Sequence, residues 1–173
     1  MNILYVVSKK DFRDEEYFIP KEMFEEHGFN VKTASIDVGC AISFFDKKID
    51  VDIKLSDVDM KEYDAIVIAG GKGALTLNDN DDLKKNLYDA MKYDKIVAAI
   101  CISPIILANC GLLQKTAATV WNEDGKQADI LKQNGALYFS ESVVIDKNII
   151  TANGPKAAKE FADSIIDALK SNN

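Results

Sequence analysis

The sequence predicts an α/β fold, a three-layer sandwich in which a mostly parallel sheet carries helices on both faces. Short, continuous apolar runs rich in β-branched residues recur along the chain, as expected of strands buried on both faces. Segments with helical spacing of apolar residues alternate with these runs. The sequence shows no internal repeat and no linker composition, so residues 1–173 are expected to form a single domain.

The first strand is expected over residues 2–8, and an amphipathic helix over 14–27 follows it and ends at Gly28. Pro20 lies inside this helical pattern and predicts a kink or a late helix start. The remaining expected elements are a strand over 31–36, a hairpin of 42–45 and 49–53, a strand over 65–69, a helix over 81–93, a strand over 96–100, a helix over 105–110, a short strand over 117–120, a helix over 126–133, strands over 137–139, 143–145 and 149–152, and a last helix from Pro155.

Composition excludes several classes of protein. Apolar residues make up 47% of the chain and charged residues 28%, which is typical of globular proteins. The net charge of −7 argues against a nucleic-acid partner, which requires a basic patch. No apolar run reaches the roughly 18 residues that span a membrane, and the N-terminus resembles a strand rather than a signal peptide. We therefore expect a cytoplasmic protein with neither a nucleic-acid nor a membrane partner.

Three cysteines and one histidine limit the possible metal and disulfide chemistry. The spacings of Cys40, Cys101 and Cys110 suggest neither a disulfide framework nor a zinc knuckle. His27 falls at the end of an expected surface helix, and a lone histidine cannot form a multi-histidine metal site. We expect no metal and no cofactor.

Cys101 lies where a buried strand is expected to turn into a helix. Ser103 and Pro104 are residue types that favour the N-cap and the first helical position, so residues 96–111 resemble a nucleophile elbow. The usual elbow has glycines two residues either side of the nucleophile, where this chain has Ala99 and Ser103. A helix N-terminus lowers thiol pKa, so a depressed pKa is expected at Cys101. The alternative is that Cys101 is a small buried apolar residue.

A second strand end carries glycines, at Gly70, Gly71 and Gly73. Neither the dinucleotide fingerprint nor the P-loop spacing is present, which disfavours a nucleotide loop. Glycines at the carboxyl end of a strand can instead present backbone N–H groups to a ligand crevice. An oxyanion hole beside Cys101 would fit this arrangement.

Three separated stretches together resemble the DJ-1/PfpI family, within the class I glutamine amidotransferase-like group. Residues 12–20 resemble the family's Phe-Glu-Asp-x-Glu-x-x-x-Pro, and residues 68–71 its Pro-Gly-Gly. Residues 99–104 resemble Ala-Ile-Cys-x-Gly-Pro, and residues 150–161 resemble the family's Thr-Ser-x-Gly-Pro and Glu-Phe. The match covers nearly the whole chain in order. It implies a flavodoxin-like, class I glutamine amidotransferase-like fold and a homodimer.

The resemblance also implies roles for individual residues. Cys101 takes the place of the reactive cysteine, and Glu16 that of the carboxyl group that bonds its sulfur. Gly71 and Ile102 would supply oxyanion-type backbone N–H groups. Four further residues are expected to line the site: Gly70, Ser103, Trp121 and Asn153. A semi-buried carboxyl at Glu16 would have a raised pKa and could donate to a thiolate.

Departures from the family pattern restrict the function. Ile102 follows the cysteine where protease-like members have histidine, and Trp121 falls where other members have one. A Cys-His dyad is therefore absent, which disfavours a peptidase of the usual kind. The expected function is a cysteine-dependent, glyoxalase-like or deglycase-like reaction on small carbonyl compounds. The alternative is a non-enzymatic redox sensor or stress protein, whose partners would be an oxidant and client proteins.

Overall fold

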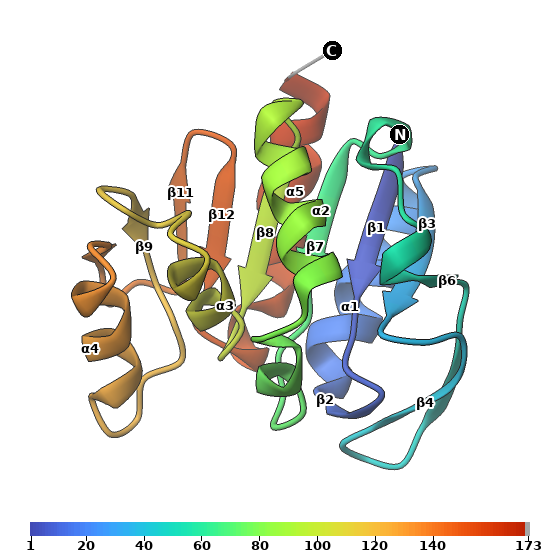
Figure 1. The fold of residues 1–173 in the computed structure, drawn as a ribbon, viewed down its shortest axis with the longest axis horizontal. Coiled ribbons are helices and arrows are strands. Elements are labelled where there is room, and N and C mark those ends of the chain that lie inside the picture. Colours follow the sequence, from blue (N-terminus) through green and yellow to red (C-terminus); the bar gives the residue numbers. More distant parts are fainter. Residues whose placement is uncertain (172–173) are drawn as a thin grey trace.

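The computed structural model describes residues 1–171; residues 172–173 of the expected domain lie outside the described residues. Its centre is a seven-stranded sheet in the order β11-β12-β8-β7-β1-β3-β6, in which β11 alone is antiparallel (Figure 1). These strands are β1 (Asn2–Val6), β3 (Asn30–Ser35), β6 (Ile53–Lys54), β7 (Ala65–Ile68), β8 (Ile96–Ile100), β11 (Val143–Asp146) and β12 (Ile149–Ala152). The predicted parallel α/β fold is confirmed.

Helices cover both faces of this sheet. They are α1 (Asp14–Glu26), α2 (Asp81–Lys92), α3 (Pro104–Asn109), α4 (Lys126–Gln133) and α5 (Ala158–Ser171). Alternation along β1 shows the two layers, because Ile3 and Tyr5 join the core that includes α1 and α5. Leu4 and Val6 join the core on the other face, with α2, α3 and α4. Figure 1 shows α2 and α3 in front of the sheet and α1 and α5 behind it.

The expected hairpin belongs to a second, small sheet. It pairs β4 (Gly39–Ser43) antiparallel with β5 (Lys48–Val51), as the sequence indicated. The small strand β2 (Lys10–Phe12), which pairs with β4, was not predicted. This pairing brings the hairpin to the carboxyl end of β1. A two-stranded pair of β9 (Ala117–Ala118) and β10 (Leu137–Tyr138) lies at the other side of the fold.

Helix α1 does not start late at Pro20. It begins at Asp14 and continues through Pro20 to Glu26. Proline lacks the N–H that would bond to the carbonyl of Glu16, four residues earlier. The hydroxyl of Tyr5 donates to that carbonyl instead. The buried strand β1 thus satisfies the group that proline leaves open, and the helix tolerates it.

Among residues 1–171, no helix has both the length and the apolar character needed to cross a membrane.

Candidate functional site

Cys101 occupies the sharp turn between β8 and α3. Its φ is +64°, in the left-handed region that residues other than glycine rarely adopt. Its N–H donates to the carbonyl of Ala152 (2.8 Å), and its own carbonyl accepts from the N–H of Trp121 (2.9 Å). These bonds to β12 and to the segment after β9 hold the strained turn in place. The side chain is half-buried.

The carboxyl group of Glu16 lies beneath this turn. Glu16 is in the first turn of α1 and is fully buried. Within residues 1–171, neither of its carboxyl oxygens makes a hydrogen bond of standard geometry. The bond from Tyr5 to the Glu16 backbone fixes the position of this residue. A buried carboxyl group without a regular partner is costly, which indicates a role other than stability.

Gly70 allows Glu16 and Cys101 to approach each other. A Cβ atom at Gly70 would collide with the Glu16 carboxyl, and it would lie 2.5 Å from Cβ of Cys101 and 2.7 Å from the carbonyl oxygen of Ile100. Only a residue without a side chain fits between them. The absence of a side chain at Gly70 therefore lets the Glu16 carboxyl group and the Cys101 side chain lie close together.

The environment of Glu16 raises its pKa to about 7, because burial disfavours the charged form. The Cys101 side chain, the N–H of Gly70 and the charge of Arg13 act in the opposite direction. Glu16 thus loses its proton near neutral pH, which agrees with the raised pKa that the sequence predicted.

Burial, followed by the charge of Glu16, raises the pKa of the Cys101 thiol to about 12. The expectation of a depressed thiol pKa was wrong, because burial and a neighbouring carboxylate outweigh the end of a six-residue helix. The N–H groups of Gly71 and Ile102 lower this pKa and therefore face the sulfur. Between the two ionisations the pair holds one proton and one negative charge, and the proton can reside on either group.

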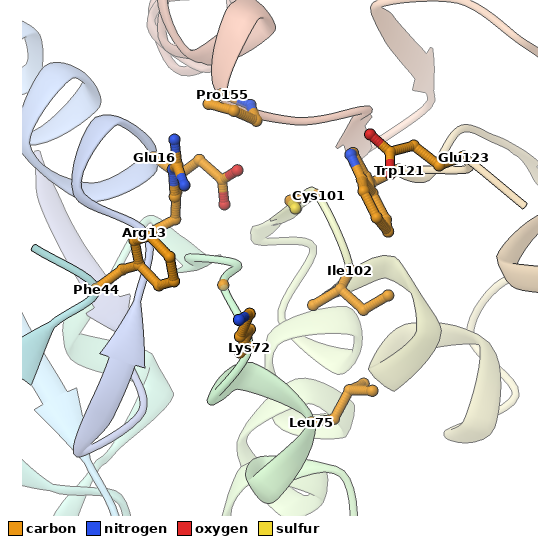
Figure 2. A pocket seen from close by; sticks show the side chains of 11 residues that line it. Arg13, Glu16, Phe44, Lys72, Leu75, Cys101, Ile102, Trp121, Glu123 and Pro155 are labelled. Atoms are coloured by element: carbon orange, nitrogen blue, oxygen red, sulfur yellow. The ribbon is translucent and has the colours of Figure 1, made fainter.

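A cavity of about 500 Å³ opens in front of Cys101. This volume suits a small ligand. Its lining residues are Arg13, Glu16, Phe44, Gly71, Lys72, Leu75, Cys101, Ile102, Trp121, Glu123 and Pro155. Figure 2 shows Arg13, Phe44 and Lys72 on one side of Cys101, and Trp121, Ile102 and Glu123 on the other.

Three of the four expected lining residues, Gly70, Ser103 and Asn153, do not line this cavity. Gly70 lies between Glu16 and Cys101 instead. Ser103 is fully buried, and its hydroxyl donates to the carbonyl of Ala69 (2.7 Å). Its backbone is helical and its side chain makes no N-cap hydrogen bond, so the expected N-cap role is not seen. Its hydroxyl instead connects the elbow to the residue after β7. Asn153 bonds through its N–H to the carbonyl of Ser142 (2.9 Å), and Pro155 reaches the cavity in its place.

Three further charged residues of the cavity, Arg13, Lys72 and Glu123, and the ring of Phe44 were not predicted from the sequence. Two of them had a usable signal. Arg13 stands where the family pattern has glutamate, and Lys72 directly follows the glycine pair after β7. Ligands of parallel sheets bind at the carboxyl ends of the strands, so both positions point toward the site. Phe44 follows β4, whose pairing with β2 was unforeseen.

The chain's one histidine is remote from this chemistry. His27 ends α1 as an exposed residue, and its ring bonds to the carbonyl of Met23 (2.8 Å). Among residues 1–171, no group of three or more histidine, cysteine, aspartate or glutamate side chains is arranged to hold a metal ion.

Comparison with known proteins extends over nearly the whole chain. The ThiJ/PfpI domain protein of Brachyspira murdochii superposes with a TM-score of 0.93 at 36% identity, over 98% of this chain and 96% of that one. The putative cysteine protease YraA of Bacillus subtilis is 29% identical over 95% of this chain and 96% of its own length. The glutathione-independent glyoxalase DJR-1.2 of Caenorhabditis elegans is 27% identical, over 96% of this chain and 88% of its own.

The family model of the DJ-1/PfpI family matches residues 1–168. This match and the structural likeness also identify the fold as the flavodoxin-like, class I glutamine amidotransferase-like type. The chain belongs to the DJ-1/PfpI family.

Proposed function

We propose that the protein converts small reactive carbonyl compounds, with Cys101 as the nucleophile and Glu16 as the group that moves protons. One observation carries this proposal. A fully buried carboxyl group, without a regular hydrogen-bond partner among the described residues, lies against the thiol of a strained turn that opens into a cavity. The raised pKa of Glu16, about 7, suits both donation and acceptance of a proton near neutral pH.

The reaction on a 2-oxoaldehyde begins when the sulfur attacks the aldehyde carbon. The S–C bond forms, the π electrons move to oxygen, and the carboxylic acid of Glu16 protonates that oxygen to give a hemithioacetal. The N–H groups of Gly71 and Ile102 stabilise the developing oxyanion. Glu16 then removes the proton from the carbon bonded to sulfur and returns it to the neighbouring carbon, while the hydroxyl proton of the hemithioacetal passes to the former ketone oxygen. The resulting thioester is hydrolysed by water to a 2-hydroxy acid, so no external oxidant or reductant is consumed.

The relative named as a glutathione-independent glyoxalase supports this proposal. The relative named as a putative cysteine protease supports a different one. Peptide hydrolysis by a thiol needs a group that protonates the leaving amine, usually a histidine. Trp121 and Ile102 line the cavity at positions where the family pattern has histidine, so we favour carbonyl chemistry over peptidase activity.

Methylglyoxal, supplied without glutathione, tests the proposal. We expect slow formation of lactate by the wild-type chain and none by Cys101→Ser. Glu16→Gln should lower the rate by about 10²–10⁴-fold, as removal of a positioned acid–base group does. Cys110→Ala is the matched control, because it removes a thiol from the other end of α3. Equal rates in Cys101→Ser and wild type would refute the role of Cys101.

A redox sensor is the second candidate, and the same pair of residues supports it. Mild peroxide would oxidise the Cys101 thiolate stepwise to sulfinic acid, each peroxide giving one oxygen atom to sulfur and leaving as water. A protonated Glu16 would donate to the sulfinate. Stable sulfinic acid at Cys101, lost in Glu16→Gln, together with no conversion of methylglyoxal, would favour the sensor over the enzyme.

A further inference from the structure

We propose that the cavity contains an anion subsite, formed by Arg13 and Lys72 around the ring of Phe44, which selects carbonyl compounds that carry a carboxylate or phosphate group. The identity of the reacting carbonyl rests on the proposed function. The subsite itself is a separate property of the cavity and can be tested without any aldehyde.

Phe44 is flanked by two cations. The guanidinium carbon of Arg13 lies 5.2 Å from the centre of its ring, and Nζ of Lys72 lies 5.3 Å from it. All three side chains line the cavity on the same side of Cys101 (Figure 2). Lys72 makes no salt bridge within residues 1–171. In a chain of net charge −7, this wall is a local positive site.

Arg13 is held in a fixed orientation. Its Nε and Nη2 donate to the two carboxylate oxygens of Glu15 (2.7 and 3.0 Å), and its guanidinium also stacks near Phe45 at 5.0 Å. An arginine has five N–H donors, so three remain for an oxyanion. Because Glu15 neutralises Arg13, Lys72 supplies most of the net charge and Arg13 most of the directed hydrogen bonds.

The opposite wall of the cavity carries a negative charge, so the two walls differ in charge. It consists of the apolar surfaces of Trp121 and Ile102 and the carboxylate of Glu123. An anionic ligand is repelled by Glu123 and attracted by Lys72. Its charged end therefore lies toward Phe44, and its carbonyl carbon lies over Cys101.

The charge of Arg13 also reaches the reacting pair. It lowers the pKa of Glu16, while Glu15, followed by Glu16 and Cys101, raises the pKa of Arg13. Because Arg13 and Cys101 line the same cavity, one small molecule can contact both.

Two alkylating reagents of nearly equal size, one anionic and one neutral, measure the preference of the cavity for an anion. The Cys101 thiolate displaces iodide from either iodoacetate or iodoacetamide, forming a C–S bond while iodide leaves with the electron pair of the C–I bond. Both reactions need the thiolate equally, so the ratio of their rates cancels changes in thiol pKa. Peptide mass spectrometry measures the ratio at Cys101 and, as an internal reference, at the exposed Cys40.

We expect iodoacetate to be favoured at Cys101 relative to Cys40. Lys72→Gln should lower that preference by about 5-fold, the size of the interaction between unit charges at about 4 Å in water. Arg13→Gln should lower it less, and Arg13→Lys should retain part of it. Lys92→Gln is the matched control, because Lys92 ends α2 outside the cavity and carries the same charge. Equal preferences at Cys101 and Cys40, or an equal fall in Lys92→Gln, would overturn the subsite.

Protection of Cys101 from iodoacetamide identifies the anion. Glyoxylate and glyceraldehyde 3-phosphate are compared with the neutral aldehydes glycolaldehyde and glyceraldehyde. Protection by glyoxylate at lower concentration than by glycolaldehyde assigns a carboxylate, and the corresponding result for the phosphate pair assigns a phosphate. Equal protection within both pairs would overturn the selection of anionic carbonyls. Loss of methylglyoxal turnover with the iodoacetate preference intact would instead refute the proposed function and leave the subsite standing.

Discussion

The two ends of helix α3 each carry a cysteine, and the two cysteines differ in what surrounds them. Cys101 precedes the helix in a left-handed turn, beside the buried carboxyl of Glu16 and in front of a cavity. Cys110 follows the helix and is buried in the apolar core. Burial raises the pKa of both thiols. Burial alone therefore does not distinguish Cys101, which we propose to be reactive, from Cys110.

The difference lies in the second titratable group. At Cys110 burial raises the thiol pKa and the charge of Lys84 opposes this, so ionisation requires loss of the thiol proton itself. At Cys101 the proton lost near pH 7 comes from the pair, because the pKa of Glu16 is about 7. Transfer of the remaining proton from sulfur to Glu16 then gives a thiolate without further ionisation. In the proposed function, this shared proton is what allows the buried thiol of Cys101 to react as a thiolate.

The largest expected contrast is in alkylation. Near pH 8 iodoacetamide should modify Cys101 well before Cys110, because only Cys101 combines access to the cavity with a proton-accepting neighbour. In denaturant the two should react alike. Peptide mapping over a time course measures both, with the exposed Cys40 as a reference for reagent strength. Equal alkylation rates of Cys101 and Cys110 in the folded chain would contradict the proposed difference between the two thiols.

Trp121→His should increase the difference between the two cysteines by adding an acid–base group next to Cys101. The indole lines the cavity, and its backbone N–H bonds to the Cys101 carbonyl, so an imidazole here would be near the sulfur. We expect methylglyoxal turnover to rise, by less than the roughly 10²-fold that a fully positioned acid–base group contributes. Steady-state kinetics of Trp121→His against Trp121→Phe separates the base from the loss of the indole. A rise in both variants alike would show that space, not proton transfer, limits the reaction.

Tyr5→Phe tests how Glu16 is held. The substitution leaves the Glu16 carbonyl without the donor that replaces the absent N–H of Pro20, at a cost of about 1–3 kcal/mol in the free energy of unfolding. Urea denaturation measures this loss. The double variant Tyr5→Phe with Pro20→Ala restores a backbone N–H and should recover part of it. If stability does not recover in the double variant, loss of the hydrogen bond to the Glu16 carbonyl is not the cause of the destabilisation.

Ser103→Ala should have the smallest effect. It removes the buried bond between the elbow and the Ala69 carbonyl, which typically contributes about 0.5–1.5 kcal/mol. Because Ser103 does not line the cavity, the pH dependence of Cys101 alkylation should stay unchanged while stability falls. A shifted pH dependence would show that this hydroxyl influences the thiol.

The sequence predicted the fold well because buried parallel strands and amphipathic helices leave distinct periodicities. Cys101 and Glu16 could be singled out because an elbow and a family pattern mark them. Long-range pairing was not visible, so β2 and the approach of Phe44 to the cavity were missed. The direction of the thiol pKa was also missed. A helix end can be read locally, whereas burial and the charge of a residue 85 positions earlier depend on the folded structure.

The pH profile of Cys101 alkylation by iodoacetamide shows whether Cys101 and Glu16 share a proton. In the wild-type chain the rate should rise with a midpoint near pH 7, set by the first ionisation of the pair, and rise again toward pH 12. In Glu16→Gln the first rise should disappear, leaving a single rise at a pH well above 7, because only the buried thiol can then ionise. The same profile in both proteins would contradict the shared proton.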